Sequence, residues 1–378
     1  MHPLPPAMHP CPALALSAAL CLHSFAQQPP QPTPPPSFHW ISGQPKVWIP
    51  TPTGNQSFDL QDLLGNKATI DSAHIYRIGD RWIIRVDSPA RPTFLLLDNE
   101  SSAPALRRLE YFAGLEKQLP TICRLFGWND IEDPADSLVY AQYPGEAADD
   151  DNGKTMAERV HSVETIDLHI RFLQQEREII ARYTLKNDEL VLQEIALPQP
   201  DAATAPQPKE QPPTLHKENG EILVRHGQHT HSLTAALGKE LRLYGIHIDR
   251  MDGQWIIRAV TRGGPCYFLL TRDHAGERME QLEYFNSLNA EMFSILRLFR
   301  LENKLSHANF RIFDANEDGS DDLLDPIVHE TGSLYMEIDF RRDDYSITAR
   351  YVLRHGKLVL TGLILDDNTQ PLPLAEKE

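Results

Sequence analysis

The stretch HIYRIGDRWIIRV, residues His74–Val86, returns 173 positions later as HIDRMDGQWIIRA, residues His247–Ala259. The same offset aligns residues 57–128 with residues 230–301 without a gap, and about 22 of these pairs are identical. An internal repeat of this length has to be recognised before any fold is assigned. The chain is therefore predicted to contain one domain twice.

The repeat continues toward the C-terminus at a slightly different offset. LHIRF and ARYTLKNDELVL (Leu168–Phe172, Ala181–Leu192) match MEIDF and ARYVLRHGKLVL (Met336–Phe340, Ala349–Leu360) at an offset of 168. The loop before this block is thus shorter in the second copy by about five residues. Two copies of this size are each large enough to fold alone, which distinguishes the chain from a solenoid.

Composition divides the rest of the chain. Segments rich in Pro, Gln, Ala and Thr without apolar periodicity precede each copy and read as a leader and a linker. The expected organisation is a signal peptide at 1–26, a disordered leader at 27–45, copy one at 46–197, a linker at 198–219, copy two at 220–366 and a disordered tail at 367–378.

Each copy shows the same predicted elements. A short helix at LQDLLGNK or LTAALGKE is followed by strand-like runs such as RWIIRV, then by a long helix, then by further strands. The long helix is predicted from apolar residues spaced three or four apart. In the copy-one helix Pro120 should produce a kink or break. In copy two these apolar residues are Met279, Leu282, Phe285, Leu288, Met292, Ile295 and Phe299. Asn187-Asp188 and His355-Gly356 are predicted hairpin turns. The predicted class is α+β, with two tandem copies of a mostly antiparallel sheet packed on one long helix.

Charge and the N-terminal region indicate the compartment. The 378-residue chain has a formal net charge of −17, which argues against non-specific binding to nucleic acid or anionic membranes. The first 45 residues contain no Lys, Arg, Asp or Glu, and the apolar run Ala13–Leu22 has the length of a signal peptide. Ser24 and Ala26 supply the small residues of a cleavage site before Gln27. We expect export to the periplasm or the extracellular space, with no transmembrane segment in the mature chain.

Cleavage would remove Cys11 and Cys21 and leave Cys123 and Cys266. In an oxidising compartment these two residues permit one disulfide, or they remain two buried free thiols within apolar runs.

An acidic loop in copy two has the spacing of a cation site. DANEDGSDDLLD, residues Asp314–Asp325, places acids and amides at alternate positions around Gly319, and hard cations take several oxygen ligands from such a loop. The pattern resembles the calcium loops of FG-GAP/VCBS propeller repeats and, with Asp325-Pro326, a thrombospondin type 3 repeat. The resemblance implies a structural calcium ion held by Asp314, Asn316, Asp318, Ser320 through its carbonyl, Asp322 and, as a sixth ligand, Asp325. The alternative is a solvated acidic turn, and copy one lacks the pattern.

A second group of metal-type side chains follows a predicted strand of copy two. HGQHTH contains His226, His229 and His231, a spacing that suits zinc or copper, although no Cys or acid in the run completes a tetrahedral set. The alternative is a solvent-exposed turn.

Several polar and aromatic residues recur in both copies. They are Trp82/Trp255, His74/His247, Arg85/Arg258, Glu110/Glu283, Tyr111/Tyr284 and Arg124/Arg297. Strand alternation places Trp82 and Ile84 on one face and Ile83 and Arg85 on the other. Glu110 and Arg124 would share one helix face. They would form part of a salt-bridge network or, alternatively, the helix would carry a catalytic acid.

The sequence contains no G-x-S-x-G, H-E-x-x-H, phosphate-loop or dinucleotide fingerprint, and no catalytic or cofactor-binding residue is assigned. The predicted function is that of an exported two-domain binding or structural protein, stabilised by calcium in copy two, whose partner is a protein or an envelope component. The alternative is a secreted hydrolase with a groove between the copies, lined by carboxylates such as Glu283 or Asp322.

Overall fold

The computed structural model describes residues 34–41, 44–51, 53–65, 69–89, 91–98, 104–111, 115–131, 137–142, 156–173, 176–198, 210–238, 243–274, 276–303, 310–314, 328–340 and 345–367. Of these residues, 64% lie in strands and 12% in helices, and the strands form five sheets. The protein is β-rich, so the predicted α+β class with one long helix in each copy is wrong.

The same order of elements occurs in both halves. The first half contains β1 (Ser37–Ile41), β2 (Gln44–Thr51), β3 (Gly54–Asp59), α1 (Leu60–Leu64), β4 (Ser72–Ile78), β5 (Arg81–Asp87), β6 (Thr93–Asp98), β7 (Ala105–Leu109), α3 (Leu119–Leu125), β8 (Ser137–Gln142), β9 (Met156–Ser162), β10 (Ile166–Phe172), β11 (Arg177–Lys186) and β12 (Glu189–Ala196). The second half contains β13 (Thr214–Glu218), β14 (Glu221–His226), β15 (His229–Ser232), α4 (Leu233–Leu237), β16 (Leu243–Met251), β17 (Gln254–Thr261), β18 (Gly264–Asp273), β19 (Gly276–Leu282), α5 (Phe285–Leu298), β20 (Phe310–Asp314), β21 (Val328–Glu330), β22 (Leu334–Phe340), β23 (Tyr345–Arg354) and β24 (Lys357–Asp367).

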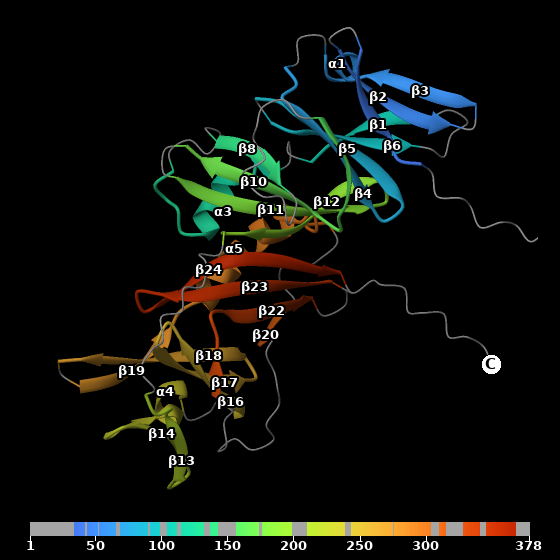
Figure 1. Cartoon of the computed structure of the whole chain (residues 1–378). Coiled ribbons are helices and arrows are strands. Elements are labelled where there is room, and N and C mark those ends of the chain that lie inside the picture. The colour runs from blue at the N-terminus through green and yellow to red at the C-terminus, as the bar shows by residue number, and fades with distance from the viewer. Residues whose placement is uncertain are drawn as a thin grey trace, which may run out of the picture.

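Each half has two small sheets of its own. A three-stranded meander (β1-β2-β3 or β13-β14-β15) is followed by a five-stranded sheet of order β7-β6-β5-β4-β9 or β19-β18-β17-β16-β21. In both five-stranded sheets the last strand, β9 or β21, pairs in parallel with its neighbour, while all other pairings are antiparallel. Figure 1 shows these small sheets at opposite ends of the molecule.

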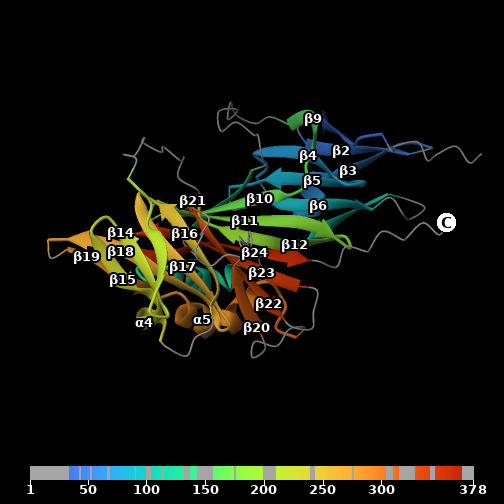
Figure 2. The same ribbon diagram turned by 90° about the horizontal axis from the view of Figure 1, so that it is seen from below.

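The remaining strands of both halves form one eight-stranded sheet. Its order is β20-β22-β23-β24-β12-β11-β10-β8, so each half supplies four adjacent strands (Figures 1 and 2). The halves meet where β12 pairs antiparallel with β24 through Glu194↔Ile364, Ile195↔Leu363 and Ala196↔Gly362. Equivalent bulges interrupt the hairpins on either side, between Arg182 and Tyr183 and between Arg350 and Tyr351.

Both predicted hairpin turns are confirmed. Asn187 and Asp188 have φ values of 50° and 62°, and His355 and Gly356 have values of 51° and 72°. Each pair links strands that stay in register up to the turn, as expected for two-residue loops with positive φ at both positions.

The hydrophobic core is arranged in three parts. The largest buried cluster lies on one face of the eight-stranded sheet and combines α3, α5 and the inner faces of both five-stranded sheets. A smaller cluster fills the space between the three- and five-stranded sheets in each half. Trp82 and Ile84 belong to the small cluster of the first half and Ile83 to the large one, which confirms the predicted alternation.

The long helices were mispredicted because a strand between two cores can imitate helical spacing. Met279 and Leu282 lie in β19 and therefore point to opposite faces of the sheet. Met279 packs against the small cluster of the second half, and Leu282 belongs to the large cluster. Apolar residues three apart thus arise without a helix. The helix proper, α5, begins at Phe285, and α3 is only 7 residues long. In the first half residues 115–116 are helical, residues 117–118 form a turn, and α3 begins at Leu119 with Pro120 in its first turn, whereas the equivalent helix α5 is continuous. The predicted break of the copy-one helix at Pro120 is therefore confirmed.

Two predicted irregular segments contain strands. The leader at 27–45 includes β1, and the linker at 198–219 includes β13, each of which pairs with the strand that follows it. In the described part of the chain, no helix has the length and apolar character needed to cross a membrane.

The junction between β12 and β24 should govern the stability of the whole chain. Leu363 is 0% exposed and pairs with Ile195 across the junction. Leu363→Ala should lower the free energy of unfolding by about 2–5 kcal/mol, because it leaves a cavity in the core that both halves share. Urea denaturation followed by circular dichroism measures this loss. Leu173→Ala, at a side chain that is 58% exposed, is the control and should change stability little. An equally small effect of both substitutions would contradict a shared core.

Candidate functional site: the pocket between the halves

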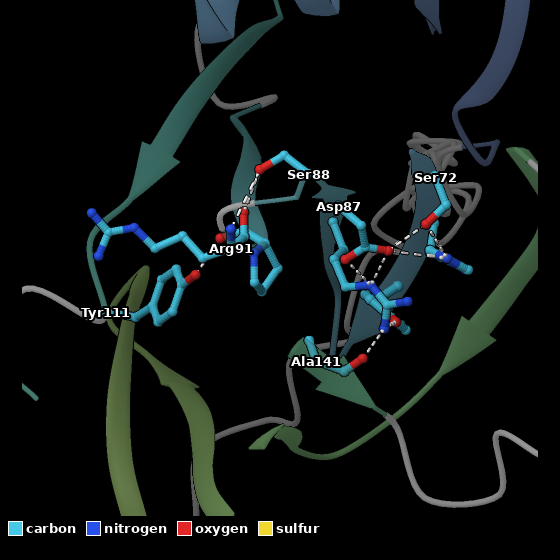
Figure 3. Close-up of polar contacts among 10 residues, drawn as sticks. Ser72, Asp87, Ser88, Arg91, Tyr111 and Ala141 are labelled. Carbon is cyan, nitrogen blue, oxygen red and sulfur yellow. Dashed lines mark hydrogen bonds and ion pairs between the residues drawn. The ribbon is translucent and has the colours of Figure 1, made fainter. Parts of the chain in front are cut away.

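A polar cluster in the first half contains His74 and Arg85, two of the residues that recur in the sequence, and Figure 3 labels its members Ser72, Asp87 and Ala141. Arg85 on β5 is almost fully buried and donates through Nη1 to the Tyr76 hydroxyl and, at 3.0 Å, to the carbonyl of Ala141. Its Nε lies 3.0 Å from Asp87 Oδ1. The guanidinium is therefore held by β4, β5 and β8 together.

The same cluster contains Ser72, His74 and Asp87, the residue types of a catalytic triad. Here, however, Ser72 Oγ and Asp87 Oδ2 approach the same ring nitrogen, His74 Nε2, at 3.2 and 3.4 Å, and Ser72 also donates directly to Asp87. A triad needs the acid and the nucleophile on different ring nitrogens. Burial tends to raise the pKa of Asp87, but His74, Arg85 and Ser72 together hold it below its usual value. The arrangement therefore supports a stable ionised carboxylate and provides no activated serine.

The equivalent cluster in the second half keeps the arginine and changes its partner. Arg258 is 0% exposed, and its Nε lies 3.1 Å from Asp249, which stands where the first half has Tyr76. Burial raises the pKa of Asp249, while Arg258 and His329 partly oppose the shift. Because both polar clusters are enclosed by strands, we infer that their role is to stabilise the fold.

One pair of histidines that recurs in both halves was not identified from the sequence. His161 on β9 lies 6.5 Å from His74 between ring centroids, and His329 on β21 lies 6.0 Å from His247. The signal was present, because His161 and His329 are related by the offset of 168 that aligns the strands after them.

Two of the three predicted histidines, His226 and His231, contact a buried acid. His226 Nδ1 and His231 Nε2 lie 2.6 and 3.3 Å from the two oxygens of Glu277 on β19. Glu277 is 2% exposed at its side chain and also contacts Arg272. The carboxylate of Glu277 contacts one ring nitrogen of each histidine. These contacts attach the hairpin β14–β15 to the five-stranded sheet. Among the described residues, no three His, Cys, Asp or Glu side chains are arranged to hold a metal ion.

A concave feature with mixed lining lies between the halves and is called here the inter-half pocket. It has a volume of about 410 Å³ and lies where the end of α3 and the residues after it face the start of α5 and the hairpin β23–β24. Its apolar part is made by Leu125, Phe126, Leu288, Ala290, Leu358, Val359 and Leu360, and its polar part by Arg124, Asn129, Glu283, Tyr284, Glu291 and Tyr351, with Gly127 also in the lining.

An ion pair joins the two helices at this pocket. Arg124 on α3 donates through Nε and Nη2 to the two carboxylate oxygens of Glu291 on α5, at 2.9 and 3.1 Å. The hydrogen bonds from Arg124 lower the pKa of Glu291, and the same contacts raise the pKa of Arg124. The prediction that Arg124 shares a helix face with Glu110 is wrong, because Glu110 lies between β7 and α3, outside any helix.

The pocket contains one of the two carboxylates that the sequence suggested for a groove between the copies. Glu283 lines it, next to Tyr284, whereas Asp322 lies outside the described residues. Of the predicted calcium ligands, Asp314 forms the end of strand β20, and Asn316, Asp318, Ser320, Asp322 and Asp325 lie outside the described residues.

The two cysteines in the described part of the chain, Cys123 and Cys266, are free thiols. Burial raises the pKa of Cys123 to about 11, so this thiol stays protonated and unreactive at neutral pH.

Comparison with known proteins gives little similarity. No protein-family model and no curated protein matches this chain. Among solved structures, AofleA from Arthrobotrys oligospora aligns at 8% identity over 88% of this chain and 85% of its own, with a TM-score of 0.19. A bifunctional GH43-CE protein from Bacteroides eggerthii aligns at 10% identity over 81% of this chain and 37% of its own, also with a TM-score of 0.19. Scores this low carry no argument about fold or function.

The pairing of Glu277 with two histidines predicts a pH dependence. Burial tends to raise the pKa of Glu277, but the contacts with His226 and His231 together hold it below its usual value of 4.5. These contacts therefore stabilise the fold fully above the unfolded pKa, and the stabilisation is lost as the pH falls through the lower folded pKa. Glu277→Gln should therefore lower stability at neutral pH, and the difference from wild type should shrink in acid. Urea denaturation at several pH values measures it. Glu280→Gln, at a half-exposed position on the same strand, is the matched control. A difference that stays constant down to pH 3 would contradict the assignment.

Proposed function

We propose that this chain is an exported binding protein that holds a small organic ligand in the inter-half pocket. A volume of about 410 Å³ is within the range of small-molecule sites, which are commonly lined by apolar side chains with a few polar groups that fix orientation. Ligand sites also occur preferentially where two structural units meet. The inter-half pocket satisfies both conditions.

The observation that carries the proposal is the bidentate pair of Arg124 and Glu291. Glycoside and related hydrolases need one carboxylic acid that stays protonated near neutral pH, and this requires a raised pKa. Glu291 has the opposite shift, and its two oxygens are occupied by the guanidinium. Among the lining residues that the structure describes, Glu283 and Glu291 are the two carboxylates, and the lowered pKa of Glu291 favours binding over hydrolysis.

Export and calcium complete the proposal. The charge-free N-terminal segment with its apolar run supports export. An exported protein meets millimolar calcium, the concentration at which weak acidic loops of this kind are filled. We assign the calcium ion a structural role in the loop that follows β20.

The pocket can be tested by closing it. Gly127 lines the pocket with a φ of +74°, and nothing lies within 4 Å of a Cβ placed on it. Gly127→Arg should abolish saturable binding of fragments found by saturation-transfer NMR on the wild type, because the long side chain enters the free space. Gly79→Arg is the matched control, since Gly79 also has a positive φ of +59° and open surroundings but lies in the β4–β5 turn. If no fragment binds, or if both variants bind the same fragments as the wild type, the proposal fails.

The calcium loop can be tested by thermal unfolding in millimolar calcium and in EDTA. A ligand that binds only the folded state at about 100 times its dissociation constant stabilises it by about 2.7 kcal/mol. Asp318→Ala should remove the calcium-dependent rise in Tm. Asp71→Ala, at an exposed acid of the first half, should retain it. Identical curves with and without calcium would leave the loop as an acidic turn.

A further inference from the structure

Each half packs a tyrosine that precedes its helix against a tyrosine on its C-terminal hairpin. The offset of 173 relates Tyr111 to Tyr284, and the offset of 168 relates Tyr183 to Tyr351. Both pairs meet edge to face, with ring centroids 6.1 Å apart for Tyr111–Tyr183 and 6.2 Å for Tyr284–Tyr351. The chain therefore has two equivalent junctions, and the one with Tyr284 and Tyr351 lines the inter-half pocket.

Three of these four tyrosines donate their hydroxyl to a backbone carbonyl. Tyr111 and Tyr284 donate to proline carbonyls, and Tyr183 donates to the carbonyl of Tyr111 at 3.4 Å. Tyr351 is only 4% exposed, yet its hydroxyl has no hydrogen-bond partner within the part of the chain that the structure describes. Because a largely buried hydroxyl without a partner costs free energy, this group can gain by bonding to a ligand.

The position of the helix explains why the fourth tyrosine differs. In the second half, α5 starts directly after Tyr284, and the carbonyl of Tyr284 accepts the N–H of Leu288 in the first helical turn at 3.1 Å. In the first half, α3 starts only at Leu119, and the carbonyl of Tyr111 accepts the hydroxyl of Tyr183. The continuous helix of the second half therefore uses the carbonyl that the hairpin tyrosine uses in the first half.

The hydroxyl of Tyr351 has access to open space at the pocket. Tyr351 is a lining residue, and its hydroxyl oxygen is not one of the fully enclosed atoms that lack a partner. By contrast, Tyr267 also packs on Tyr284, but its hydroxyl is fully enclosed and it does not line the pocket. Burial raises the pKa of Tyr351 above its usual value, so the hydroxyl keeps its proton at neutral pH and is able to donate.

The surroundings of this donor favour an uncharged acceptor. Leu288 and Leu358 form part of an apolar wall. The charges of Arg124 and Glu291 are already paired through hydrogen bonds of 2.9 and 3.1 Å. A carboxylate placed at Tyr351 would lose much of its hydration in exchange for a bond to a neutral hydroxyl, which is costly, whereas a carbonyl oxygen loses less. An apolar body with one carbonyl group matches these features.

We infer that the inter-half pocket takes a small uncharged molecule with an apolar body and a carbonyl-type acceptor, and that Tyr351 anchors the acceptor. This inference rests on the proposed binding function and names the ligand class and the residue that selects it. Tyr351→Phe isolates the claim, because it removes only an oxygen that has no partner among the described residues.

Three compounds with the same aromatic ring test the inference. Acetophenone carries a carbonyl oxygen, ethylbenzene has a chain of the same length without it, and benzoate is an anion. Their dissociation constants are measured by NMR titration of the wild type and of Tyr351→Phe. The substitution should weaken acetophenone binding about three- to tenfold, the size of one net hydrogen bond, and leave ethylbenzene binding unchanged. Benzoate should bind the wild type more weakly than acetophenone does.

Tyr183→Phe is the matched control at the equivalent position of the other junction. It should leave the affinity for acetophenone unchanged. The two variants should also differ in urea denaturation, because Tyr183→Phe removes a hydrogen bond within the fold and Tyr351→Phe removes none. The midpoint should therefore fall in Tyr183→Phe and stay at the wild-type value in Tyr351→Phe.

The outcomes separate the ligand class from the binding function. An unchanged affinity for acetophenone in Tyr351→Phe, an equal loss for acetophenone and ethylbenzene, or tighter binding of benzoate would overturn the inference. Binding that is lost in Gly127→Arg would still support the proposed function in each of these cases, and binding that Gly127→Arg does not affect would overturn that function as well. If none of the three compounds binds the wild type, the ligand class is wrong, and the fragment screen decides the binding function separately.

Discussion

The pairing of β12 with β24 is the contact on which the rest of the molecule depends. Three residue pairs join two four-stranded units into one sheet, and they bury what would otherwise be an open edge in each half. Because the sheet is continuous, α3 and α5 lie on the same face and belong to one core. The bidentate contact of Arg124 with Glu291 then becomes possible, and with it the pocket that the two helices border.

Within this frame, the two halves keep their apolar positions and differ in their polar ones. The tyrosines that donate to a proline carbonyl, Tyr111 and Tyr284, are the same in both. By contrast, Tyr76 becomes Asp249 beside the buried arginine, and Glu194 becomes Gly362 beside Arg350. In the second case a Cβ on Gly362 would lie 3.2 Å from Arg350 Nη2, so the arginine occupies the space that a side chain would need. Packing fixes the architecture, and the exchanged polar residues change the contacts of the arginines in each copy.

The sequence was informative where a local rule governs structure. Positive-φ turns at Asn187-Asp188 and His355-Gly356 and the alternation around Trp82 follow from the chemistry of neighbouring residues, and both were predicted. The helix boundaries failed because Met279 and Leu282 are buried by two different cores, and only the tertiary structure shows that there are two. A groove between the copies lined by Glu283 was predicted as the alternative, but the rest of the lining of the inter-half pocket was not. The pocket depends on the contact between Arg124 and Glu291, which are 167 residues apart. No pattern along the sequence indicates that contact.

The position of the pocket explains why duplication matters to it. Two identical subunits related by a two-fold axis must carry identical sites at equivalent junctions. A single chain with both copies is free of this constraint, and the exchange of Gly127 for Arg300 and of Glu291 for Gln118 uses that freedom. The ion pair that borders the pocket uses the glutamate of the second copy, and the equivalent residue of the first copy, Gln118, carries no charge. Exchanges at these two positions thus make the two equivalent junctions chemically different, although the halves share the same order of elements.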